Sequence, residues 1–256
     1  MSWETVTLEW DGDVATLTID RPDALNALNV ETLEAMQEAL AEAKREDARA
    51  LVLTGAGNAF IAGADIKYMQ DLSTEEALEW GELGHAVADA IEAFPAPVVA
   101  AINGFALGGG CEMAAACDLR VAAESAVIGQ PEIDLGIVPG FGGTQRLPEV
   151  AGEEAARRII YLGQRLDAET AAEVGLVGEV VGDDELDARA SDLAAELAEK
   201  PALALRGAKR AMNQRAEGSK EAGLGYEREV FAGLFGTHDQ REGMEAFVED
   251  RDPSFK

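Results

Sequence analysis

The sequence predicts an α/β protein, in which short strands alternate with helices over roughly the first 190 residues and helices dominate the remainder. Three observations lead to this fold class. Alternating apolar and polar residues flank a turn near the start, apolar residues recur at helical spacing further on, and short apolar runs end in glycine. Alternation of strands and helices predicts largely parallel pairing of the strands. The chain has 256 residues, 47% of them hydrophobic, which is enough for a real core.

The first elements are a hairpin, a helix and a buried strand. Residues 5–19, "TVTLEWDGDVATLTI", alternate apolar and polar side chains around Asp11-Gly12, which is a hairpin signal. Residues 31–46 carry leucine, methionine and alanine at helical spacing, and residues 49–55, "RALVLTG", read as a short apolar strand.

A second helix is predicted to begin at Ser73. Ser73 and Glu76 have the spacing of a capping box, and two prolines, the first at Pro95, end the helical pattern. Further short apolar runs predict strands at 98–104, 118–123 and 126–136.

The segment 105–118, "FALGGGCEMAAACD", combines three glycines with a run of alanines. Glycine is poor in a helix interior and alanine is the best residue there, so the segment predicts a strand end, a turn and a helix start. Glu112 falls in the first helical turn. From Glu153 onward the chain is predicted to be almost wholly helical, with one short strand at 177–182.

The charge balance limits the partners. Asp and Glu total 49 against 21 Lys and Arg, a formal net charge of −28, which disfavours nucleic acid as a partner. No apolar run approaches the roughly 20 residues of a membrane-spanning helix. The N-terminus has neither a basic start nor an apolar region, so no secretory signal is expected. With only Cys111 and Cys117, the composition suits a reduced cytoplasm.

Such an acidic surface suggests a salt-accumulating cytoplasm. Self-repulsion destabilises a compact chain of this charge at low ionic strength, and high salt screens it, because the Debye length falls to about 3 Å at 1 M. The alternative is an acidic protein of an ordinary cytoplasm.

Three glycine-containing segments follow predicted strands, at 54–69, 103–113 and 136–147. The nucleotide-binding signal is weak, because Phe60 stands where the dinucleotide fingerprint needs its third glycine and no segment ends in Gly-Lys-Ser/Thr. Backbone N–H groups at a helix start lack intrahelical partners, so two segments together could form an oxyanion hole. A turn explains each segment taken alone better than a function does, but the presence of three such segments favours a binding role.

Two acids have surroundings that set them apart. Glu112 is either a first-turn acid favoured by the helix dipole or a buried carboxylate with a chemical role, since its neighbours are small and apolar. Glu132 follows Pro131 in "VIGQPEIDLG" and is either an exposed loop acid or part of a core-facing stretch. Two carboxylates in one apolar site would make a general acid and base pair.

Nearly the whole chain resembles the crotonase (enoyl-CoA hydratase/isomerase) family, whose members share a coenzyme A site but catalyse several reactions. The segments that carry the resemblance are "DRPDALNAL" (20–28), "AGNAFIAGADIKYM" (56–69), "INGFALGGGCEMAAACDLRVA" (102–122), "GQPEIDLGIVPGFGGTQRL" (129–147) and "REGMEAFVEDR" (241–251). The resemblance implies a crotonase-like spiral of ββα units over 1–195, with the coenzyme A and catalytic site, and a helical C-terminal oligomerisation region over 196–256. That region is expected to build homotrimers or homohexamers.

The resemblance also implies a reaction and the residues that carry it. The thioester oxygen is expected between the N–H groups of Ala64 and Gly109, and the catalytic pair is Glu112 and Glu132. Water adds across C2 and C3 of a trans-2-enoyl-CoA, with Glu112 as the base on water and Glu132 as the proton donor to C2. No metal or redox cofactor is implied. The residues expected to bind coenzyme A or substrate are Ala24, Leu25, Ala62, Asp65, Ile66, Lys67 and Gly140, with Phe231 from a neighbouring subunit.

The chain departs from the family pattern at two positions near the expected coenzyme A phosphates. Many relatives have lysine where this chain has Asp23 and Asp250. Lys67, Arg251 and Lys256 are the candidates to compensate. Acyl chain length is not encoded in any motif, although Leu78 and Trp80 are candidates to cap a short pocket.

Several rival functions stay open. Within the family these are an enoyl-CoA isomerase and a short-chain 3-hydroxyacyl-CoA dehydratase, since hydration is reversible. A serine hydrolase is disfavoured, because the two histidines, His85 and His238, lie outside the glycine segments. A non-catalytic or RNA-binding relative is disfavoured by the glutamate pair and the net charge.

Overall fold

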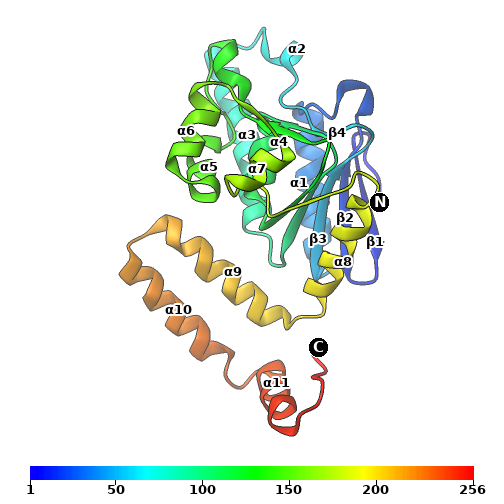
Figure 1. Ribbon diagram of the computed structural model, residues 1–256, viewed down its shortest axis with the longest axis vertical. Coiled ribbons are helices and arrows are strands. Elements are labelled where there is room, and N and C mark those ends of the chain that lie inside the picture. The colour runs from blue at the N-terminus through cyan, green and yellow to red at the C-terminus, as the bar shows by residue number, and fades with distance from the viewer.

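Three consecutive strand–strand–helix units build the body of the protein in the computed structural model (Figure 1). In each unit the first strand joins a large sheet, the second joins a small sheet, and a helix follows. The units are β3 (Ala50–Gly55), β4 (Ala59–Ile61) and α3 (Thr74–Glu92); β5 (Val98–Ile102), β6 (Phe105–Leu107) and α4 (Gly109–Ala116); and β7 (Leu119–Ala123), β8 (Val127–Gly129) and α5 (Gly143–Ala151).

Equivalent strands of successive units pair in parallel, β3 with β5 and β5 with β7 in the large sheet, β4 with β6 and β6 with β8 in the small one. The chain therefore advances as a spiral of ββα units, and the predicted fold class is confirmed. The large sheet is completed by β1 (Val6–Asp11), β2 (Val14–Ile19) and β10 (Glu179–Val181), in the order β1-β2-β3-β5-β7-β10. The predicted hairpin about Asp11-Gly12 joins β1 to β2.

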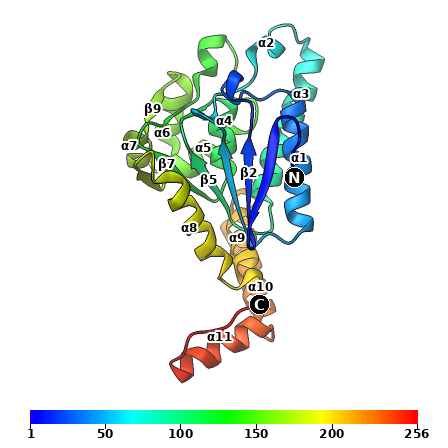
Figure 2. The same ribbon diagram turned by 90° about the vertical axis from the view of Figure 1, so that its right-hand side faces the viewer.

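The central strands β3 and β5 of the large sheet are buried on both faces, and their side chains alternate between the two faces. In β3, Leu51 and Leu53 join the larger core, which also contains residues of α1 (Val30–Arg45), α3 and α4. The intervening Ala50 and Val52 pack with Leu186 and other residues of α8 (Leu186–Ala198). Figure 2 shows α8 and α1 on opposite sides of the sheet. The predicted capping box at Ser73 is present at the start of α3.

The expectation of an almost wholly helical chain after Glu153 was wrong at one place. Residues Arg165–Asp167 form a strand, β9, which pairs antiparallel with β8 at the edge of the small sheet. Three residues with exposed ends carry no apolar alternation, so the pattern had no signal to detect. The remaining helices of the body are α2 (Ile66–Met69), α6 (Glu153–Tyr161) and α7 (Ala168–Glu173), with short 3₁₀ helices at Pro22–Ala24 and Pro131–Leu135.

Three helices extend beyond the body: α9 (Ala202–Glu217), α10 (Lys220–Leu234) and α11 (His238–Glu249) (Figure 1). The structure describes residues 1–215 and 218–256 with their side chains, and α9 continues through residues 216 and 217. Helix α9 is anchored to the body by Lys209, whose buried Nζ donates to Ile91 O, Ala96 O and Asp118 Oδ2, the last at 2.7 Å.

By contrast, none of the described side chains of α10 is buried. The division into 1–195 and 196–256 stays a prediction, and it falls within the last turn of α8. Among the described residues, none of the helices combines the length and the apolar character that crossing a lipid bilayer requires.

Candidate active site

The glycine segment between β6 and α4 places Glu112 against the small sheet. Gly108 precedes the helix with φ +51°, a conformation that favours glycine, and an added Cβ would lie 2.8 Å from Glu132 Oε1. Gly110 packs so closely on β4 that an added Cβ would lie 1.9 Å from Ile61 O. The helix then begins at Gly109, and Glu112 lies in its first turn, as predicted.

Glu112 is a buried carboxylate with a defined orientation. It is only 1% exposed, and its Oε1 accepts hydrogen bonds from the backbone N–H groups of Phe141 at 2.8 Å and Gly143 at 2.7 Å. Burial raises its pKa, because desolvation disfavours the charged form, while these two donors act in the opposite direction. The interpretation of Glu112 as a mere first-turn surface acid is therefore wrong.

Glu132 comes from the 3₁₀ helix Pro131–Leu135 and faces the same region. It is partly buried, and its Oε2 has no hydrogen-bond partner among the described residues. Burial raises its pKa from 4.5 to about 7, with a smaller contribution from the charge of Glu112. A carboxyl group with this pKa exists in both protonation states near neutral pH, which suits a proton donor.

Ala64 and Gly109 both line this region, and the bridge to Leu28 and the hydrogen bonds of helix α4 do not use their backbone N–H groups. Leu28 pairs with Ala64 as an isolated parallel bridge, in which Leu28 N–H donates to Gly63 O and Leu28 O accepts from Asp65 N–H, both at 2.8 Å. Since Leu28 bonds only to the residues on either side of Ala64, the N–H of Ala64 points away from Leu28. The N–H of Gly109 belongs to the first turn of α4 and lacks an intrahelical acceptor.

One cavity of about 270 Å³ brings these groups together. It is largely apolar, and the acidic residues in its wall are Glu112, Glu132 and Asp134. Of the predicted site residues, seven line it: Ala62, Ala64, Ile66, Gly109, Glu112, Glu132 and Gly140. Its other walls come from α2, α3, β6, the segment 131–141 and Arg165.

The remaining predicted residues lie outside this cavity. Leu25 is exposed and connects to it through its carbonyl, which accepts from Ala62 N–H at 3.0 Å, and Ala24 is its chain neighbour. Asp65 faces Arg21 at 3.4 Å and caps the short helix that carries the exposed Lys67. Phe231 lies on α10 against Phe235 and does not line the cavity of its own chain.

Sequence reasoning missed the residues that hold Glu112 in place. Phe141 and Gly143 act through their backbone, and Arg146 donates to Phe141 O at 3.0 Å while pairing with Asp89 and Glu92 of α3. The segment 136–147 stood out for its glycines, but backbone donors carry no side-chain signal.

Gln130 was also missed. It is fully buried, and its side-chain amide has no hydrogen-bond partner among the described residues. A Cβ added to Gly143 would lie 2.4 Å from its Nε2, so Gln130 lies beside the segment that binds Glu112.

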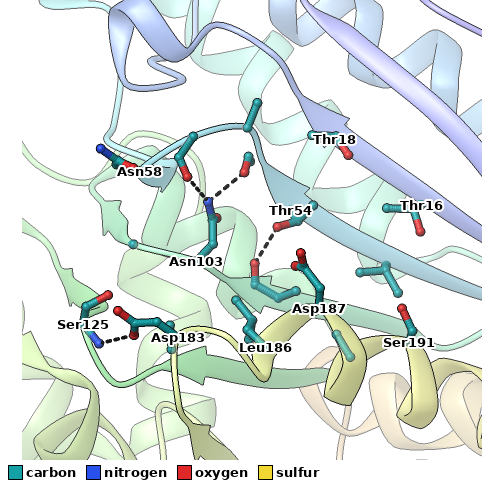
Figure 3. Close-up of a pocket in the computed structure, with 18 of the residues that line it drawn as sticks. Thr16, Thr18, Thr54, Asn58, Asn103, Ser125, Asp183, Leu186, Asp187 and Ser191 are labelled. Atoms are coloured by element: carbon teal, nitrogen blue, oxygen red, sulfur yellow. Dashed lines mark hydrogen bonds between the residues drawn. The ribbon is translucent and has the colours of Figure 1, made fainter.

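A larger cavity of about 780 Å³ lies on the opposite side of the large sheet, beside α8 (Figure 3). Its described lining contains Glu9, Asp183 and Asp187 but no lysine or arginine, and it includes none of the predicted site residues. Within its lining, the side-chain amide of Asn103 donates hydrogen bonds to Gly55 O at 2.7 Å and Gly57 O at 2.9 Å (Figure 3). This acidic lining would repel the phosphates of a nucleotide thioester.

Comparisons with known proteins show which family the chain resembles in sequence and in fold. The family model described as "Enoyl-CoA hydratase/isomerase" matches residues 9–256. The chain is 44% identical to a crotonyl-CoA hydratase of Syntrophomonas wolfei, covering 100% of this chain and 99% of that protein. It is 43% identical to a short-chain-enoyl-CoA hydratase of Clostridium acetobutylicum, covering 98% and 97%. The solved enoyl-CoA hydratase of Bacillus anthracis superposes with a TM-score of 0.94 at 38% identity, covering 99% of each chain.

Proposed function

The chain belongs to the enoyl-CoA hydratase/isomerase family, as its motifs predicted, and we propose that it is an enoyl-CoA hydratase. It adds water reversibly across the C2–C3 double bond of a trans-2-enoyl-CoA to give a 3-hydroxyacyl-CoA. The observation that supports this function most directly is the single cavity lined by Glu112, Glu132, Ala64 and Gly109. The names of the relatives from Syntrophomonas wolfei and Clostridium acetobutylicum support the same reaction.

The two glutamates divide the proton transfers. The two N–H groups that bind Glu112 Oε1 orient its carboxyl group and oppose the rise in its pKa that burial causes. Once ionised, its other oxygen takes a proton from the attacking water. Glu132, with a pKa of about 7, supplies the proton to C2 while the hydroxyl adds to C3. The negative charge that develops on the thioester oxygen is stabilised by the N–H groups of Ala64 and Gly109. These steps use protein groups and water, without a metal or redox cofactor.

Coenzyme A is held at the mouth of the cavity as part of the substrate. Ala24, Leu25 and the segment 62–67 form the proposed surface for its adenine and pantetheine groups. Many relatives have lysines at the positions of Asp23 and Asp250, near the expected coenzyme A phosphates. Lys67 is exposed and forms no ion pair with any described residue, so it is the candidate to bind these phosphates instead. Arg251 is less suited, because it already pairs with Glu242 and Glu249.

The enzyme is proposed to assemble as a homotrimer or homohexamer in the cytoplasm, with Phe231 of a neighbouring subunit beside the coenzyme A. The exposed apolar side chains of the C-terminal helices support an assembly, since Phe231 is 64% and Phe247 88% exposed in the single chain. Packing such surfaces together removes them from water. The net charge of −28 supports a protein adapted to high salt.

The test is hydration of crotonyl-CoA, followed by the loss of enoyl-thioester absorbance, in concentrated KCl and in dilute buffer. The wild-type protein and Glu132→Gln are compared, and size-exclusion chromatography checks that both assemble alike. Turnover by the wild type that the variant loses supports the proposal. A folded, assembled wild type without turnover on any enoyl-CoA would refute it and favour another reaction of the family.

A further inference from the structure

Beyond the two glutamates, the candidate cavity has an apolar wall that the proposed reaction does not use. It is formed by Met69 of α2, Trp80 of α3, Leu107 of β6, and Ile137 and Val138 of the segment 136–147. Because the thioester oxygen and the double bond occupy the polar part of the cavity, this wall is left to the hydrocarbon end of the acyl group. Its shape therefore decides which acyl groups fit.

Trp80 is the largest side chain in this wall and is held by aromatic packing. It is 7% exposed and meets the ring of Phe141 edge-on, with centroids 4.8 Å apart. Tyr68 packs on it from α2 at 6.1 Å. Its indole N–H is buried and donates to no described residue, so packing alone holds the ring in place.

Phe141 cannot retreat to make room for a longer acyl group. A Cβ added to Gly84 would lie 2.0 Å from Phe141 Cδ1, and one added to Gly109 would lie 3.1 Å from its Cδ2. The ring therefore fills the space between α3 and α4. The backbone of Phe141 also binds Glu112, so movement of this residue would disturb the catalytic carboxylate. The Trp80–Phe141 pair is thus a rigid part of the wall.

The remaining space is small. A cavity of about 270 Å³ lies just below the roughly 300–1,000 Å³ typical of small-molecule pockets. Leu78, the other candidate to cap the pocket, is 64% exposed and does not line the cavity, which leaves Trp80.

We infer that Trp80 is the specificity-determining residue that restricts this site to short acyl groups such as crotonyl. The inference rests on the proposed function, because it concerns the acyl end of the same site. An acyl chain much longer than crotonyl would have to displace the indole ring, and the packing of Phe141 between Gly84 and Gly109 opposes this.

The experiment measures kcat/KM for crotonyl-, hexenoyl- and octenoyl-CoA with the wild type, Trp80→Ala, Trp80→Phe and Leu78→Ala. We expect the wild type to prefer crotonyl-CoA. Trp80→Ala should raise the ratio of kcat/KM for octenoyl-CoA to that for crotonyl-CoA by at least about 10-fold, since each methylene in an apolar pocket changes discrimination about 10- to 200-fold. Leu78→Ala should leave the ratio unchanged.

Trp80→Phe is the second variant, which keeps the inference testable if Trp80→Ala fails to fold. It keeps an aromatic ring against Phe141, loses no hydrogen bond, and should raise the ratio in the same direction by a smaller factor. An active, assembled Trp80 variant whose ratio equals that of the wild type would overturn the inference while leaving the proposed function intact. A wild type inactive toward all three substrates would overturn the proposed function and this inference with it.

Discussion

The backbone N–H of Phe141 donates to Glu112 Oε1 at 2.8 Å, while the ring of the same residue packs edge-on against Trp80. One residue thus connects the proposed base to the wall of the acyl pocket. A substitution at Gly84 that shifts the Phe141 ring is therefore expected to affect the orientation of Glu112, although Gly84 does not itself line the cavity.

Gly84→Ala tests this connection. Its Cβ would clash with the Phe141 ring at 2.0 Å, so the ring must move. We expect a fall in kcat of about 100-fold, as for a misplacement of about 1 Å, and a loss of about 1–3 kcal/mol in unfolding free energy from overpacking. Gly81→Ala is the control, because its Cβ would meet only Gly140 O at 3.8 Å and should leave activity nearly unchanged. Equal activity in the two variants would contradict the connection.

The rate of hydration should depend on the protonation of Glu132. Its pKa of about 7 means that the proton-donating form is lost as pH rises through 7, so kcat for hydration should fall with pH above that value. Glu132→Gln should lose about 100- to 10,000-fold in kcat and show no such titration. The matched control Glu154→Gln alters a carboxylate on the surface of α6 and should keep the wild-type profile. A flat wild-type profile between about pH 5 and about pH 9, a range that brackets the pKa of Glu132, would rule out this role.

The same carboxyl group should affect stability in the opposite sense from an ordinary salt-bridged acid. The pKa of Glu132 is raised from 4.5 when unfolded to about 7 when folded, so its favourable contribution is complete below the unfolded value. That contribution is lost as pH rises through the folded value. Urea unfolding of Glu132→Gln should therefore show a smaller decline in stability across this window than the wild type. The interpretation fails if the two curves stay parallel.

Lys209 should be essential for attaching α9 to the body. In Lys209→Met, Asp118 loses its charged partner and keeps the N–H of Val98, so we expect a loss of about 3 kcal/mol in unfolding free energy. Lys200→Met removes an exposed pair with Glu196 on the surface and should cost about 0–1 kcal/mol. Denaturant unfolding measures both. Similar losses in the two variants would mean that the buried contact does not anchor α9.

Salt should stabilise the protein through its net charge of −28. Raising KCl from dilute buffer to about 1 M shortens the Debye length to about 3 Å, which screens repulsion between surface carboxylates. We therefore expect the midpoint of thermal unfolding to rise with KCl and activity to follow it. A midpoint that does not change with KCl concentration would contradict the proposed adaptation to high salt and indicate an acidic protein of an ordinary cytoplasm.

Local patterns were sufficient for most of the fold. The hairpin at Asp11-Gly12, the capping box at Ser73 and the helix start that carries Glu112 each depend on residues close together in the sequence, and all three are present. The family motifs likewise identified the family, because long segments kept their residues. The edge strand β9 was missed, since its three residues pair with β8 and carry no pattern of their own.

The site depends on contacts between distant segments, which no local pattern contains. The small apolar neighbours of Glu112 favoured burial, whereas spacing alone favoured an exposed loop position for Glu132. The fold buried Glu112 and lined one cavity with both. Phe141 became important through its backbone N–H and through a ring wedged against Gly84, which lies 57 positions earlier in the chain. The sequence alone identified the candidate residues, because the chemistry of a side chain depends on its type. Their burial, the raised pKa values of the glutamates and the apolar wall of the cavity arise only in the folded chain, where packing excludes water from these side chains.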